Sequence, residues 1–158
     1  MKLKNIKKHF ISNKGQSLFE LLVAIAMVSL VLVAIISLTT TAVGNTTLAR
    51  EKSLAAKHTQ EGMEWLRNQR DLNWDAFIAR GTSEGKTWCL SSLNWSNPNP
   101  CTSTAFITQT RFIREGVVTY DAINSPDTIN VVVTTRWSGK GGDHQSNATT
   151  TLTNWKAN

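Results

Sequence analysis

Hydrophobic and polar positions divide the chain into segments of different character. Residues 18–38 (LFELLVAIAMVSLVLVAIISL) form an apolar run of 21 residues with one charge, Glu20. At about 1.5 Å of rise per helical residue, this run reaches roughly 30 Å, the hydrocarbon thickness of a bilayer. The pattern therefore predicts one helix that can cross a membrane once.

The next segment has a weaker and then a stronger helical pattern. Residues 39–47 (TTTAVGNTT) are β-branched, polar or glycine, which are poor helix formers, so we expect a weak point where the helix could loosen. From Leu48 to about Arg70, apolar and small side chains recur at spacings of three, four and seven, with charged residues such as Glu51 placed mostly elsewhere. This stripe predicts an amphipathic helix packed on a globular head; its members are Leu48, Ala55, Thr59, Gly62, Met63 and Leu66.

Beyond residue 72 the helical period fades. Glycines and prolines between residues 81 and 100 indicate loops. Four segments rich in β-branched and aromatic residues predict an antiparallel sheet of three or four strands, and the sequence SGKGGD at residues 138–143 predicts a turn before the last segment. The predicted strand segments are residues 105–114, 117–120, 129–137 and 148–155. The fold class is therefore α+β: a long N-terminal helix, with a membrane-spanning half and an amphipathic half, packed on a small antiparallel sheet.

Charge is distributed unevenly along the 158 residues. The chain has a formal net charge of +6, but residues 1–15 hold five lysines and no acid, which leaves +1 for the rest. A near-neutral remainder has no basic stripe for phosphate, so we expect no nucleic-acid partner. Lysines directly before the apolar run favour a cytoplasmic N-terminus and an exported C-terminal part.

The two cysteines, Cys89 and Cys101, lie in the loop-rich stretch. In an exported segment they are most simply one disulfide, with free buried thiols as the alternative. A metal site needs more ligands than these two, and the three histidines are scattered at His9, His58 and His144.

Candidate chemistry is sparse elsewhere. No catalytic motif occurs, so we expect no enzyme, no catalytic residue, no cofactor and no metal. The oxygen-rich residues Asp121, Asn124 and Asp127 could hold calcium, although an ordinary turn explains them better. Of the six tryptophans, we expect Trp137 and Trp155 in the core. Trp88 and Trp95 lie at the loop bounded by Cys89 and Cys101, which we call the cysteine loop, and form the best candidate contact surface.

Residues 14–20 (KGQSLFE), followed by the apolar run, resemble the class III signal of type IV pilins and type II secretion pseudopilins. That signal is a basic leader ending in glycine, with glutamate as the fifth residue after the cut. The resemblance implies that a prepilin peptidase cleaves between Gly15 and Gln16 and that the new amine is methylated. Gln16 departs from the Phe or Met that is usual at this position.

The resemblance also implies an organisation and a function. Residues 1–15 would be the cleaved leader, 16–38 the transmembrane and filament-core helix, 39–72 its amphipathic continuation, 73–104 a loop region with the disulfide and 105–158 the sheet head. Glu20 of one subunit would pair with the Gln16 amine of another and set the axial register during assembly. The protein would be a minor pilin or pseudopilin.

The same resemblance implies partners and a location. The partners would be other pilin subunits, the prepilin peptidase and an assembly platform protein. The precursor would cross the cytoplasmic membrane once with its N-terminus inside, and the assembled form would be a cell-surface or periplasmic filament. The alternative function is that of an uncleaved single-pass membrane protein whose head binds an extracellular ligand.

Overall fold

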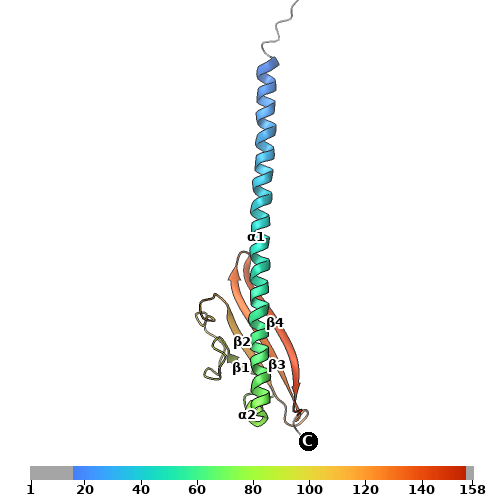
Figure 1. Cartoon of the computed structure of the whole chain (residues 1–158), viewed down its shortest axis with the longest axis vertical. Helices are drawn as coiled ribbons and strands as arrows, with labels where there is room; N and C mark the ends of the chain where they lie inside the picture. The colour runs from blue at the N-terminus through green and yellow to red at the C-terminus, as the bar shows by residue number, and fades with distance from the viewer. Residues whose placement is uncertain (1–15, 156–158) are drawn as a thin grey trace, which may run out of the picture. The chain divides into compact units, whose positions relative to one another are not determined.

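The computed structural model describes the backbone of residues 16–155 and the side chains of residues 18–155 (Figure 1). The predicted leader, including Gly15, lies outside them. In chain order the elements are helices α1 (Gln16–Leu72) and α2 (Trp74–Ile78) and strands β1 (Lys86–Cys89), β2 (Ile113–Thr119), β3 (Thr128–Gly139) and β4 (Gly142–Thr153). The predicted α+β class is confirmed. The chain divides into two compact units, Met1–Gly44 and Asn45–Asn158, and we call the second unit the head.

Helix α1 runs without interruption through the threonine-rich stretch where a weak point was expected. Thr39 donates its hydroxyl proton to the Ile35 carbonyl at 2.8 Å, and Thr41 donates to the Ser37 carbonyl at 3.0 Å. These bonds satisfy the hydroxyls inside the helix. The propensity cost of a β-branched residue is only a few tenths of a kcal/mol, so the helix continues.

Four antiparallel strands form one sheet in the order β1-β2-β3-β4 (Figure 1). Strands β3 and β4 form a long hairpin in which Thr128 pairs with Thr153 and Gly139 with Gly142. Gly141 and Gly142 have φ values of 96° and 115°, which favour glycine at this turn. The predicted turn is confirmed, but β4 begins at Gly142, six residues before the predicted strand.

The strand predicted from residue 105 and the loop predicted before it were both wrong in part. Residues 105–112 form a loop because the Ile107 amide bonds to the Phe112 carbonyl at 2.8 Å, which folds the chain back on itself. Strand β2 starts only at Ile113 and includes most of the segment predicted at residues 117–120. Conversely, α2 and β1 lie in the stretch expected to be loop.

The predicted stripe on α1 packs on the sheet and forms the centre of the head. Thr59 is buried on it, and its hydroxyl lies 2.9 Å from the Thr135 hydroxyl on β3. Met63 and Leu66 join a buried cluster with alternating residues of β3, as expected for a strand with one buried face. The β3 members of this cluster are Ile129, Val131 and Val133.

Candidate functional site

The apolar part of α1 is exposed on every side. From residue 18 to residue 38 its large hydrophobic side chains are between 37% and 73% exposed, with Val23 and Leu30 at the two ends of that range. The helix is long and apolar enough to cross a membrane. The hydroxyl of Ser29 donates to the Ile25 carbonyl at 2.8 Å, so this polar group needs no water. The surface therefore suits lipid or other apolar helices.

Glu20 is the one charged residue of this surface. Its neighbours around a shallow hollow are Phe19, Val23, Ala24 and Met27. Among the residues whose side chains are described, no cationic group lies within 4.0 Å of the Glu20 carboxylate. Gln16 is the first described residue of α1, four positions before Glu20. The described side chains therefore supply no cationic partner for this carboxylate.

In the head, a buried carboxylate joins α1 to the sheet. Glu51 is only 7% exposed, and it accepts a hydrogen bond from the Trp137 indole nitrogen at 3.0 Å. Its other oxygen pairs with the Arg111 guanidinium. The Trp137 ring stacks on His144 with 5.3 Å between centroids. The sequence pattern did not indicate that Glu51 lies on the buried face of α1.

A second buried charge, Arg114 on β2, connects α1 to the cysteine loop. Its side chain is 2% exposed, and it donates to the Leu90 carbonyl at 3.1 Å and the His58 carbonyl at 2.8 Å. Glu61 lies 3.4 Å away. Burial lowers the pKa of Arg114, whereas the hydrogen bond from His58, with help from Arg114, lowers the pKa of Glu61. The buried arginine is therefore held by backbone carbonyls and one carboxylate.

Cys89 and Cys101 form the predicted disulfide, with Cα atoms 4.7 Å apart. The loop is also held at its second end because the Cys101 amide donates to Glu115 at 2.8 Å. Glu115 in turn accepts from Arg136 at 2.7 Å. The cysteine loop is thus attached to the sheet by covalent and polar contacts.

Three of the four tryptophans assigned from the sequence differ from prediction. Trp88 is 6% exposed and Trp95 is partly buried against the core, so they do not form an exposed contact surface. Trp137 is in the core, as predicted, at 3% exposure. Trp155 is 62% exposed, and its indole donates to Asp71.

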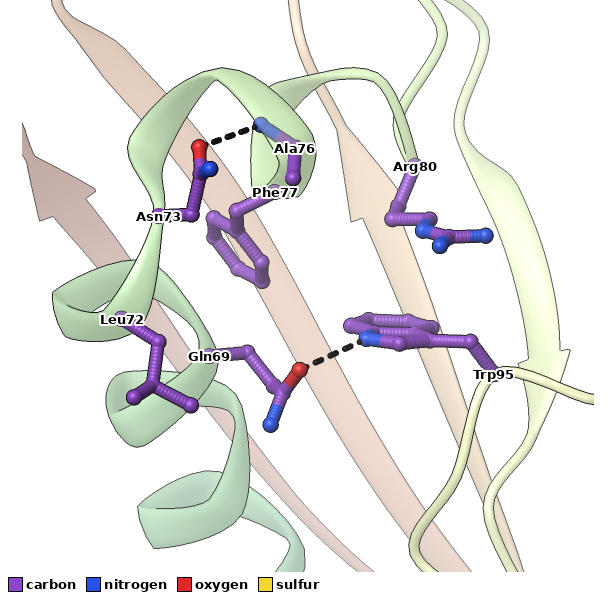
Figure 2. Close-up of a pocket in the computed structure, with 7 residues that line it drawn as sticks. All are labelled: Gln69, Leu72, Asn73, Ala76, Phe77, Arg80 and Trp95. Atoms are coloured by element: carbon purple, nitrogen blue, oxygen red, sulfur yellow. Dashed lines mark hydrogen bonds between the residues drawn. The ribbon is translucent and has the colours of Figure 1, made fainter.

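Where Trp95 lies, a small pocket opens between α2 and the end of α1 (Figure 2). The Trp95 indole donates to the Gln69 side-chain oxygen at 2.9 Å, and the Arg80 guanidinium lies over the Trp95 ring. The Asn73 side chain accepts from the Ala76 amide at 2.9 Å and caps α2. The sequence indicated Trp95 as a contact residue but gave no sign of this pocket.

The loop considered for calcium is organised by its own hydrogen bonds. The Asp121 carboxylate accepts from the Ile123 and Asn124 amides at 2.9 and 3.1 Å and from the Asn124 side chain at 2.6 Å. These bonds lower the pKa of Asp121. Such bonds are typical of an ordinary turn, which the sequence favoured over a calcium site.

Comparisons with protein-family models, with curated proteins and with solved structures find no match. The architecture is pilin-like: a long N-terminal apolar helix whose later part packs on a four-stranded antiparallel sheet. Beyond architecture, the link to pilins depends on the motif at residues 14–20.

Proposed function

We propose that this chain is a minor pilin or pseudopilin, a structural subunit of a type IV pilus-like filament rather than an enzyme. The observation that carries the proposal is the apolar surface of α1, exposed on every side and bearing one carboxylate, Glu20. Contiguous apolar surface of this extent marks an interaction or membrane site. A bilayer covers it before assembly, and like helices cover it afterwards.

The leader sets the topology and the processing of the precursor. Its five lysines keep the N-terminus in the cytoplasm. A prepilin peptidase then cleaves between Gly15 and Gln16, and the new amine is methylated. The processed subunit passes from the cytoplasmic membrane into the filament through an assembly platform protein.

Glu20 acts in this proposal as a positioning residue. A carboxylate inside a dry bundle of helices has a desolvation cost of several kcal/mol. The N-terminal amine of Gln16 in a neighbouring subunit has a similar cost, and pairing offsets both. Because the pair forms at only one axial offset between neighbours, it sets the register of assembly.

The mass of the mature N-terminus tests the processing step. The chain is isolated from its native membrane and filament fractions, and its N-terminal peptide is identified by mass spectrometry. We expect a peptide that begins at Gln16, with the mass of one methyl group added where the amine is modified. A cell-surface form that retains residues 1–15 would overturn the pilin assignment and favour an uncleaved single-pass membrane protein with a ligand-binding head.

A separate experiment tests the role of Glu20. Glu20→Gln keeps the shape of the side chain and removes its charge, whereas Ser29→Ala removes a hydroxyl bonded only within the helix. We expect both variants to insert and be cleaved like the parent chain. Filament incorporation should fall at least tenfold for Glu20→Gln alone, since breaking a buried ion pair costs about 3–5 kcal/mol. Equal incorporation of both variants would refute the register role.

A further inference from the structure

Arg80 differs from the other arginines of the head. Among the described residues no carboxylate lies within 4.0 Å of its guanidinium, and unlike the exposed Arg50 its side chain is half-buried. Five other arginines pair with carboxylates: Arg67, Arg70, Arg111, Arg114 and Arg136. An anion could therefore pair with Arg80 without displacing a carboxylate of the described chain.

Two indole rings hold the guanidinium in place. The central carbon of Arg80 lies 5.5 Å from the Trp88 ring centroid and 5.6 Å from the Trp95 centroid. The Arg80 carbonyl also accepts from the Trp88 indole at 2.9 Å, which fixes the backbone beside the rings. Cation–π contacts neutralise no charge and occupy none of the N–H donors. Within the described part of the chain, the guanidinium N–H groups of Arg80 therefore make no hydrogen bond.

The other polar groups of the pocket are donors as well (Figure 2). The Gln69 side-chain oxygen accepts from the Trp95 indole, and the Asn73 side-chain oxygen accepts from the Ala76 amide. Each amide has therefore used its carbonyl internally and retains its NH₂ group. Three donor side chains, one of them charged, line the same pocket.

The size of the pocket limits what it can hold. Its volume is about 90 Å³, well below the roughly 300–1,000 Å³ of a pocket for a drug-sized ligand. The remaining wall is largely apolar, with Phe77 buried and Leu72 at the rim. Apolar walls strengthen a charged hydrogen bond inside them. We infer that this pocket binds a carboxylate group, with Arg80 supplying the charge and two parallel N–H bonds.

The carboxylate can come from two sources. One is a free small organic acid, and the other is an acidic side chain of a second copy of this chain. Both present the same planar carboxylate to the parallel N–H groups of the Arg80 guanidinium. The inference concerns the head alone and does not depend on the proposed filament role.

Indole N–H resonances of the ¹⁵N-labelled full chain in detergent micelles test the inference. The Trp95 indole bonds to Gln69 in the pocket wall, so its resonance reports on occupancy, and Trp95→Phe identifies it. Sodium acetate is titrated at low protein concentration, with sodium chloride at equal ionic strength as the control. A separate dilution series without acetate tests for the second copy.

We expect a saturable acetate shift at Trp95, at least tenfold weaker in Arg80→Gln and unchanged in Arg50→Gln. Arg80→Lys retains the charge without the parallel N–H groups and should give an intermediate affinity. An unshifted Trp137 indole shows that each variant is folded. A concentration-dependent shift that requires Arg80, without an acetate response, assigns the site to a second copy. A chloride response equal to that of acetate, or no Arg80-dependent shift in either series, overturns the inference.

Discussion

Replacing Glu51 with alanine should lower the free energy of unfolding by about 2–3 kcal/mol. The variant leaves the Trp137 indole N–H without its acceptor while the tryptophan remains 3% exposed. An unsatisfied buried donor costs about 1–3 kcal/mol. The lost pair with Arg111, whose side chain is 52% exposed, adds about 0.2–1 kcal/mol.

Glu64→Ala is the matched control on the same helix. Glu64 is 67% exposed and pairs with the half-exposed Arg67 at 2.5 Å, so its loss should cost at most about 0.5 kcal/mol. Both substitutions replace glutamate by alanine inside α1 and change helix propensity equally. Glu51→Gln retains an acceptor for Trp137 and should cost about 1 kcal/mol.

Urea denaturation of the full chain in detergent micelles, followed by tryptophan fluorescence, gives the three differences. The order Glu51→Ala, Glu51→Gln, Glu64→Ala from most to least destabilising supports the reasoning. A Glu51→Ala value within about 0.5 kcal/mol of the control would show that the buried carboxylate does not anchor α1 to the sheet.

Three further predictions concern the head. Gly62→Ala would place a Cβ 2.8 Å from Arg114 Cδ and 2.9 Å from Val133 Cγ1; overpacking of about 1–3 kcal/mol should exceed the helix gain of about 1 kcal/mol, and a more stable variant in urea denaturation would contradict this. Reducing the Cys89–Cys101 bond should lower the unfolding free energy by roughly 2–3 kcal/mol. The variant with both cysteines replaced by serine should have the same unfolding free energy as the reduced protein, and reductant should not change it. His58 and Arg114 lower the pKa of Glu61 from 4.5, so the stability that the Glu61 carboxylate supplies is present above pH 4.5 and is lost as the pH falls through the lowered pKa. Glu61→Gln should therefore reduce the loss of unfolding free energy between pH 5 and pH 3. An equal loss in the variant and the parent chain would refute the pairing.

Hydrophobic period predicted the face of α1 that packs on the sheet, and β-branched and aromatic content together with a turn sequence predicted the strands of the α+β fold. The same period also contained Glu51, since positions 48, 51, 55, 59 and 62 follow helical spacing. A charged residue is rarely buried without a partner. Its partners Arg111 and Trp137 are 60 and 86 residues away, so no local signal identified them.

Strand β1 and the pocket around Arg80 could not be predicted for a related reason. Four residues, Lys86–Cys89, are too short for a clear alternation, and they become a strand by pairing with β2. The burial of Trp95 and the exposure of Trp155 likewise depend on distant contacts. The large apolar ring of tryptophan favours burial, but tertiary packing decides which tryptophans are buried.

Both buried hydrophobic clusters in the described chain are built from Ala55 onward, with no contribution from the apolar run. A change in the medium around residues 18–38 therefore removes no contact from these two clusters. Those residues can exchange lipid for protein surroundings while every core contact of the head persists. Under the proposed function, the segment that would pass from lipid into the filament contributes nothing to the buried clusters of the head.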